Sequence, residues 1–209
     1  MQIEIQNCTK QIGKAAILSD ISLHMESGRI YGFAGANGSG KTMLMRAVCG
    51  LIRLSGGQIL VDGKALGKEL SFPESVGALI ENPGFIPYYS GYKNLKILAD
   101  LKGRIGQEEI DAILRRLGLY DVKDDKVKTY SLGMKQKLGI AAAVMEEPAL
   151  LVLDEPFNGL DEKSVELVKE IVGEKKAQGA LVILSCHDRA LLEDLSDEIF
   201  MIENGRIVG

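Results

Sequence analysis

The chain has 209 residues, a formal net charge of −4 and a sequence pI near 5.4, so its length suits one domain, or one domain with an inserted lobe. The mild acidity argues against binding to a nucleic-acid backbone, because such proteins carry a basic face. The sequence shows no signal-peptide pattern and no apolar stretch long enough to span a bilayer, so we expect any membrane role to be peripheral.

Short β-strands dominate the elements predicted before residue 82. Alternating or short apolar runs bounded by glycine predict strands over 3–8, 29–35, 57–63 and 75–81. A helix over 41–52 follows the second of these strands, and we expect it to end near a glycine. We predict an antiparallel β part at the N-terminus, with one early helix.

The middle of the chain, residues 82–147, has a different pattern. Apolar residues recur at helical spacing over 92–103 and 106–119, and again in a segment that begins at Ser131. We therefore predict an α-helical lobe, over 82–147, inserted into an α/β core formed by 1–81 and 148–209. The whole chain, 1–209, is expected to be a single domain of this kind.

The last third returns to strands. Residues 149–155 and 180–188 are continuous apolar runs, which are typical of parallel strands covered on both faces, and an amphipathic helix over 161–179 connects them. Asn204-Gly205 between two apolar runs predicts a hairpin. The carboxyl ends of parallel strands share one edge of a sheet, so we expect the ligand at that edge.

One segment fits a phosphate-binding motif in full. The residues "GANGSGKT" match G-x-x-x-x-G-K-[ST] and stand between a predicted strand and a predicted helix. The backbone N–H groups and the helix N-terminus attract phosphate oxygens, while Lys41 would reach the β- and γ-phosphates and Thr42 would hold Mg²⁺. The predicted nucleotide-binding residues are Gly35, Ala36, Asn37, Gly38, Ser39, Gly40, Lys41 and Thr42.

Acidic and imidazole side chains follow the two predicted buried strands. Asp154 ends the first and fits a carboxylate that positions Mg²⁺, while Glu155 is the candidate base or water-orienting group. His187 follows the second strand and is expected within reach of a γ-phosphate. The plainer alternatives are a solvated loop for the two acids and a structural role for the histidine.

The helix that begins at Ser131 carries Lys135 and Lys137 close to its N-terminus. Cations are unfavourable there, because the first turn of a helix already carries partial positive charge. Either this helix start awaits an anion, or it is an ordinary capped helix with exposed lysines.

Together, these motifs resemble the nucleotide-binding subunits of ATP-binding cassette (ABC) transporters. The resemblance covers nearly the whole chain and rests on "GANGSGKT", "YSLGMKQ", "LLVLDEP", "NGLD" and "SCH", in that order. It implies the P-loop NTPase fold, ATP and Mg²⁺ as ligands, and hydrolysis catalysed by Glu155, His187 and Lys41, with Thr42 and Asp154 at the metal. It also implies a second cassette subunit and a separate membrane permease as partners, on the cytoplasmic face of the membrane.

The resemblance assigns further residues and shows departures from the family pattern. Ser131 and Gly133 match the family's signature motif, which faces the γ-phosphate held by a second copy, although Leu132 replaces a glycine. Glu81 stands where the family has a glutamine near the metal, and Ile12 where it has an adenine-stacking aromatic residue. A carboxylate can still reach the metal or its water, and Ile12 can contact the base without stacking.

The partner and substrate rest on weaker signals. Four of the eleven aromatic residues (Phe85, Tyr88, Tyr89 and Tyr92) cluster in "GFIPYYSGY", which fits either a contact surface or local packing. By resemblance this region would receive the permease, and the chain looks most like cassettes that export antimicrobial peptides, such as bacitracin, or confer resistance to them. The alternatives are a soluble ABC-type ATPase acting on nucleic acid or the ribosome, and a non-enzymatic nucleotide-dependent adaptor.

The three cysteines, Cys8, Cys49 and Cys186, are far apart in apolar surroundings. We predict that they are buried and reduced, as in a cytosolic protein.

Overall fold

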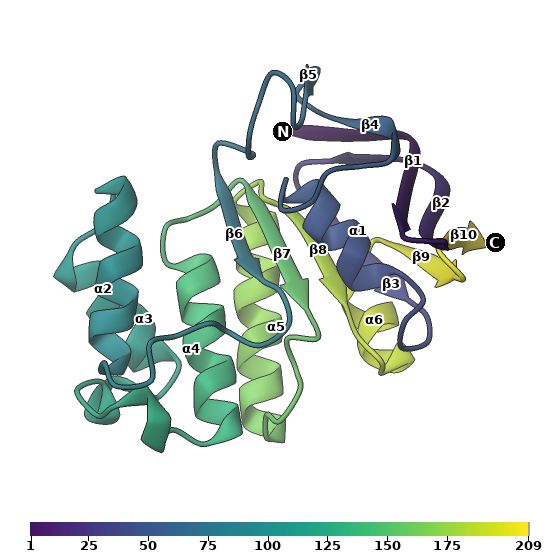
Figure 1. The fold of residues 1–209 in the computed structure, drawn as a ribbon. Coiled ribbons are helices and arrows are strands. Elements are labelled where there is room, and N and C mark those ends of the chain that lie inside the picture. Colours follow the sequence, from purple (N-terminus) through teal and green to yellow (C-terminus); the bar gives the residue numbers. More distant parts are fainter. Residues whose placement is uncertain (209) are drawn as a thin grey trace.

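The computed structural model describes residues 1–208 and contains two β-sheets with helices around them (Figure 1). The antiparallel sheet has the strand order β2-β1-β4-β5. Its strands are β1 (Gln2–Ile12), β2 (Ala15–Glu26), β4 (Gly56–Val61) and β5 (Lys64–Ala65). This sheet is the predicted N-terminal antiparallel part.

The second sheet has the order β10-β9-β3-β8-β7-β6 and is parallel except for the pairing of β10 with β9. Its strands are β3 (Ile30–Ala34), β6 (Val76–Leu79), β7 (Leu150–Asp154), β8 (Leu181–Ser185), β9 (Glu198–Glu203) and β10 (Arg206–Val208). The predicted hairpin at Asn204-Gly205 is confirmed, since it joins β9 to β10.

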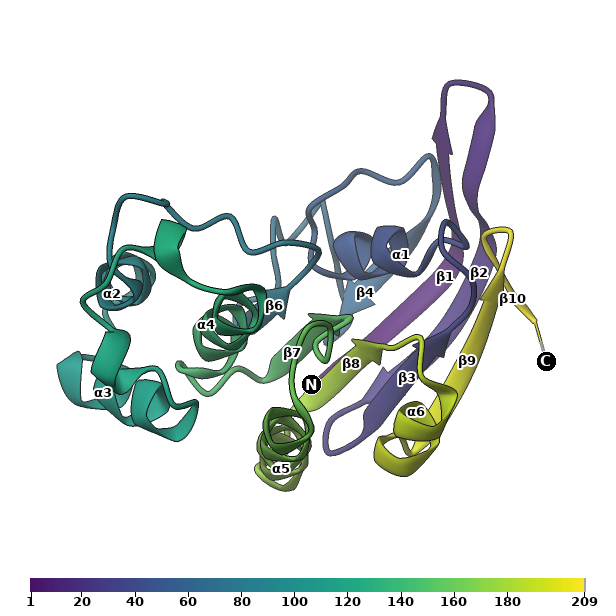
Figure 2. The same ribbon diagram turned by 90° about the horizontal axis from the view of Figure 1, so that it is seen from below.

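Six α-helices surround the sheets within residues 1–208. They are α1 (Lys41–Val48), α2 (Gly91–Lys102), α3 (Gln107–Arg116), α4 (Leu132–Val144), α5 (Glu162–Ala177) and α6 (Arg189–Leu195). Figure 2 shows α1 on one face of the parallel sheet and α5 and α6 on the other, with α2, α3 and α4 grouped to one side. None of the helices in residues 1–208 combines the length and the apolar character needed to cross a bilayer.

Two apolar clusters cover the two faces of the parallel sheet. On β7, Leu150 and Val152 belong to the cluster that includes α1 and the antiparallel sheet, whereas Leu151 and Leu153 belong to the cluster that includes α4 and α5. All five residues of β7 and of β8 are buried, which explains their continuous apolar sequences. The three cysteines are buried and unpaired, as predicted.

One helix end differs from the sequence prediction, and two elements were not predicted. The helix expected over 41–52 ends at Val48, because Gly50 adopts φ = 76° and turns the chain away. Strand β2 was missed, as was the short helix α6. The irregular register between β1 and β2, with bulges near Cys8, weakens the simple alternation that identifies a strand in sequence. His24 lies on β2, with its Nε2 3.0 Å from Gln2 Nε2.

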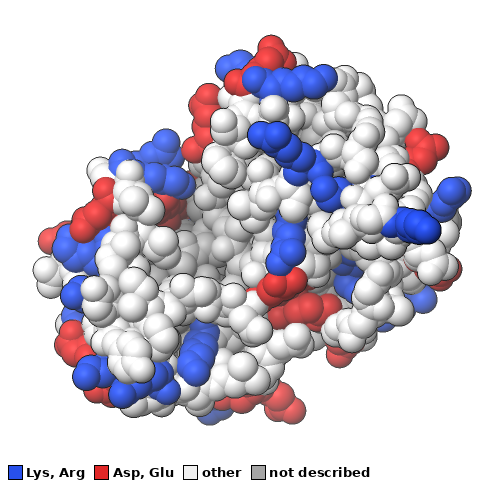
Figure 3. Space-filling model, in the orientation of Figure 1, with Lys and Arg blue, Asp and Glu red and all other residues white. Residues whose placement is uncertain are grey.

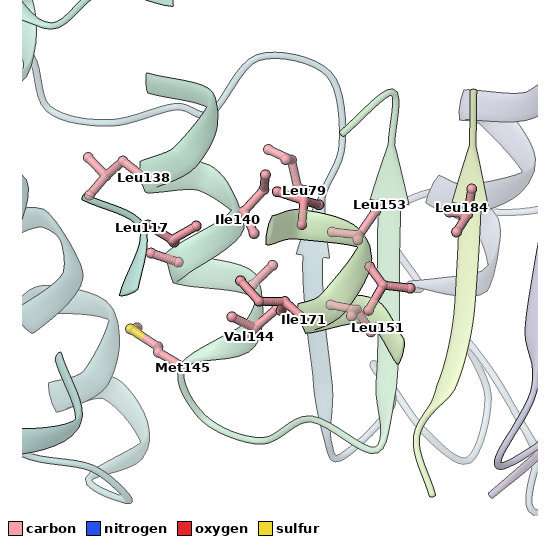
Figure 4. Packing of buried hydrophobic residues seen from close by; sticks show 14 of the residues in the cluster. Leu79, Leu117, Leu138, Ile140, Val144, Met145, Leu151, Leu153, Ile171 and Leu184 are labelled. Atoms are coloured by element: carbon pink, nitrogen blue, oxygen red, sulfur yellow. The ribbon is translucent and has the colours of Figure 1, made fainter. Parts of the chain in front are cut away.

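The helical lobe is joined to the sheet through α4. Figure 4 shows Ile140 and Val144 of this helix facing Leu79 of β6 and Leu151 of β7, whereas Leu138 lies on the opposite side of α4. The approach is close, because a Cβ atom placed on Gly77 of β6 would overlap the carbonyl oxygen of Ala143. The absence of a side chain at position 77 therefore sets the distance between α4 and β6.

We predict that Gly77→Ala lowers the free energy of unfolding by about 1–3 kcal/mol or more, because backbone atoms must move to make room for the added Cβ. The matched control is Gly173→Ala in α5, where an added Cβ meets nothing within 4 Å, and which should stabilise the helix by up to about 1 kcal/mol. Urea unfolding followed by circular dichroism measures both changes. A Gly77→Ala protein as stable as the wild type would contradict the close packing of α4 on β6.

Candidate nucleotide-binding site

A cleft of about 370 Å³ lies at the carboxyl edge of the parallel sheet. Its lining combines the predicted phosphate-binding segment with side chains from three neighbouring strand ends. The lining residues are Ile17, Asn37, Gly38, Ser39, Gly40, Lys41, Thr42, Met43, Arg46, Glu81, Asp154, Glu155 and His187. The structure thus brings together most of the residues that the sequence predicted for one site.

The phosphate-binding loop is folded around its own lysine. Lys41 is buried, and its Nζ donates hydrogen bonds to the carbonyl oxygens of Gly35 at 2.7 Å and Ala36 at 3.1 Å. The Oγ of Ser39 is buried without a hydrogen-bond partner among residues 1–208. A buried ammonium held only by carbonyl oxygens, beside an unsatisfied hydroxyl, is a setting that an oxyanion would complete, so the loop fits a phosphate group.

A chain of hydroxyl and carboxylate groups links the loop to the sheet. Thr42 Oγ1 donates to Asp154 Oδ2 at 2.7 Å, and Ser185 Oγ donates to Asp154 Oδ1 at 2.6 Å. Asp154 is only 5% exposed, so these two hydroxyls compensate for much of its lost hydration. A hydroxyl and one carboxylate beside a phosphate loop match the donor set that Mg²⁺ takes with a nucleotide, so the residues present fit that ion.

Glu155 and His187 form the other wall of the cleft. Glu155 Oε1 lies 3.2 Å from His187 Nε2, and the backbone N–H of His187 donates to Glu155 Oε2 at 3.2 Å. Burial raises the pKa of Glu155, and the nearby His187 and Lys41 lower it in part. A carboxylate with a raised pKa, held in place by a histidine, is suited to accept a proton from water.

The turn that carries Glu155 is held on several sides. Glu155 has φ = 51°, which is uncommon for a residue other than glycine. Its backbone N–H donates to Ser185 Oγ at 3.0 Å, and its carbonyl accepts from Gln136 Nε2 at 3.0 Å. Gln136 belongs to α4, so the lobe helix directly positions the turn that bears the candidate base.

Gly35 and Ala36 contact the cleft only through Lys41, and three other predicted site residues lie elsewhere. Ser131 caps α4, where its Oγ accepts from the N–H of Met134 at 3.2 Å, and a Cβ on Gly133 would lie 2.7 Å from the Gly159 carbonyl oxygen. Neither residue lines the cleft of its own chain. Ile12 is 54% exposed at the end of β1, and Ile17 of β2 lines the cleft instead.

Comparison with known proteins now decides the family. The family model described as ABC transporter matches residues 18–158, which include the phosphate loop, Asp154 and Glu155. The chain belongs to the ABC transporter family.

Two relatives support the same assignment for this cassette. The uncharacterized ABC transporter ATP-binding protein YybJ of Bacillus subtilis (strain 168) is 44% identical over 205 residues, which cover 98% of this chain and 94% of the relative. The bacitracin transport ATP-binding protein BcrA of Enterococcus faecalis is 38% identical over 208 residues, which cover 99% of this chain and 68% of the relative.

A solved structure described as the ATP binding subunit of an ABC transporter agrees with the fold of this cassette. It has a TM-score of 0.90 and 27% identity, and the match covers 100% of this chain and 89% of that chain. The fold is therefore the predicted P-loop NTPase fold with an inserted helical lobe. The cassette is an ATP-hydrolysing, ATP-binding subunit of an ABC transporter, and these findings favour transport over the alternative of a nucleic-acid or ribosome-directed ATPase.

The structure adds site residues that sequence reasoning missed. Ser185, Gln136, Arg46 and Ile17 all contact or line the cleft. Ser185 had a visible signal, since it ends the same apolar run that precedes His187. The side chains of Arg46 and Gln136 lie on helices, and no local pattern shows which face of a helix meets the cleft.

We predict that Ser185→Ala lowers both stability and ATP hydrolysis by the cassette. It removes one hydrogen bond to Asp154 and leaves the N–H of Glu155 unpaired, which costs about 1–3 kcal/mol of unfolding free energy. Ser75→Ala is the control, because Ser75 Oγ accepts from the N–H of Ala149 at the opposite end of β7. Denaturant unfolding and phosphate release test both variants, and an unchanged ATPase rate in Ser185→Ala would contradict the positioning role.

Proposed function

We propose that this cassette hydrolyses Mg²⁺·ATP at composite sites formed with a second cassette, and that this drives export through a separate membrane permease. One observation carries the proposal. The cleft holds the phosphate loop, Thr42, Asp154, Glu155 and His187, whereas the signature residues lie outside it on α4. A complete set of phosphate contacts then requires the signature helix of another copy.

The N-terminus of α4 suits that role. Leu132 is 64% exposed and Lys135 lies in the first turns of the helix, so the end of α4 offers N–H groups and positive charge outward. Such an end attracts the γ-phosphate, and hydrolysis removes that attraction. The intrachain packing of Gly133 against Gly159 supports a link between the signature and the "NGLD" turn, which we propose communicates between the two sites.

Within each site we assign roles to the chain's own groups. Lys41 leaves its carbonyl partners for the β- and γ-phosphates, and Ser131 and Gly133 of the opposing copy meet the γ-phosphate. Thr42 and Asp154 would hold Mg²⁺, which would neutralise phosphate charge, and Glu81 lines the same cleft. Glu155 accepts a proton from the attacking water, and His187 orients the Glu155 carboxylate and the γ-phosphate. Ile12 is proposed to contact the adenine base.

A groove of about 320 Å³ on the lobe supports a permease as partner. It lies between β6, α2 and α4, and its apolar lining includes Pro83, Phe85, Ile97 and Leu98. Figure 3 shows this hollow between the lobe and the rest of the molecule, with mostly uncharged atoms inside it. Phe85 and Tyr92 pack partly into the core, whereas Tyr88 is 69% exposed, so the aromatic cluster serves both packing and surface.

We propose that an apolar helical segment of the permease occupies this groove, which would place the cassette on the cytoplasmic face of the membrane. Residues 82–147 then form the lobe that contacts the permease, and residues 1–81 and 148–209 form the catalytic core. The similarity to a bacitracin transport protein supports a peptide antibiotic as the exported substrate.

We predict that Glu155→Gln lowers kcat by about 10²–10⁴-fold, because the proton acceptor is lost. ATP binding remains, and ATP-dependent dimers become more stable because the bridging γ-phosphate persists. Single-turnover assays and size-exclusion chromatography with ATP measure these effects. Glu162→Gln, at the exposed start of α5, should behave as the wild type, and normal turnover in Glu155→Gln would refute the assignment.

We predict that Leu98→Asp prevents copurification with the permease and leaves basal ATP hydrolysis unchanged, because a charge in the groove must be desolvated on docking. Leu101→Asp is the matched control, since Leu101 lies on the same helix and is 78% exposed but does not line the groove. Affinity purification of tagged cassette variants from membranes tests the pair. Equal permease recovery with both variants would rule out this groove as the docking site.

A further inference from the structure

An ion pair in the nucleotide cleft joins α1 to the loop that follows β6. Arg46 Nη2 lies 2.6 Å from Glu81 Oε2, and both residues line the cleft. Arg46 follows Thr42 by four positions on α1, so the two side chains share one face of the helix. The pair therefore places a guanidinium beside the metal-binding region proposed above.

Glu81 reaches this region from the adjacent strand end. Leu79 of β6 pairs with Leu153 of β7, so the residues that follow, Glu81 and Asp154, leave neighbouring strands at the same edge. Glu81 adopts φ = 57°, a left-handed conformation that a non-glycine residue holds at a cost. The backbone is thus held in a turn that brings the Glu81 carboxylate into the cleft.

The two cationic side chains of the cleft, Lys41 and Arg46, have different partners. Lys41 donates to carbonyl oxygens of the phosphate loop, so Arg46 is the group that pairs with the Glu81 carboxylate. The Arg46 and Glu81 side chains are 33% and 54% exposed, so water screens the pair and its strength is modest. A divalent cation can therefore displace Arg46 from the Glu81 carboxylate.

We propose that Arg46 is a positioning residue that competes with Mg²⁺ for the Glu81 carboxylate. Arg46 pairs with Glu81, and bound Mg²⁺ would instead draw the Glu81 carboxylate to the ion or its water and release Arg46. The inference rests on the Mg²⁺ site proposed above. It assigns Arg46 the task of setting how strongly nucleotide binding depends on the metal.

The test compares binding of a fluorescent, non-hydrolysable ATP analogue in Mg²⁺ and in EDTA. The dissociation constant in EDTA divided by the dissociation constant in Mg²⁺ measures how much the metal strengthens binding. Arg46→Gln should raise this ratio by about two- to fivefold, the range that one partly exposed ion pair supports, because the competitor is gone. Glu81→Gln should lower the ratio, and Arg46→Gln added to Glu81→Gln should cause no further change.

Two controls sharpen the result. Arg46→Lys keeps the charge and should stay near the wild-type ratio, and Arg53→Gln removes an exposed arginine that does not line this cleft. The proposal is overturned if Arg46→Gln leaves the ratio unchanged, weakens analogue binding equally with and without Mg²⁺, or keeps its effect in Glu81→Gln. A wild-type chain that binds the analogue equally in Mg²⁺ and EDTA would instead contradict the metal site itself.

Discussion

The site depends on the buried carboxylate of Asp154 and the two hydroxyls that hold it. Thr42 approaches from the phosphate loop and Ser185 from the neighbouring strand, so a single side chain joins α1, β7 and β8. Because Asp154 is almost fully buried, any arrangement that lost these hydrogen bonds would leave a carboxylate without hydration. The same constraint sets the end of β7, and with it the turn that presents Glu155.

The fold separates the two sets of groups that we propose contact phosphate. The parallel sheet gathers the loop, Asp154, Glu155 and His187 at one edge, while the signature residues begin α4 in the lobe. Gln136 of α4 donates to the Glu155 carbonyl, so a hydrogen bond joins the lobe to the turn that bears the candidate base. A change in the position of the lobe therefore reaches the candidate base directly, and the apolar groove lies on that same lobe.

Much of this arrangement could be predicted from the sequence. The continuous apolar runs that became β7 and β8 give a strong signal because both faces of these strands are buried, and the phosphate motif is local in sequence. Strand β2 and helix α6 were missed, because a bulged edge pairing and a seven-residue helix leave weak periodicity. The contacts of Ser185 with Asp154 and of Arg46 with Glu81 join positions 31 and 35 residues apart, so they depend on tertiary packing.

The central claim is that each chain supplies half of a nucleotide site, and complementation between two inactive variants tests it most directly. Lys41→Ala removes the phosphate contact of its own chain, and Ser131→Arg blocks the signature that it offers to a partner. If sites are shared, each variant alone is inactive, and an equimolar mixture regains ATP hydrolysis because mixed dimers contain one intact site. A mixture that stays inactive, under conditions where the wild-type chain alone hydrolyses ATP, would contradict the account.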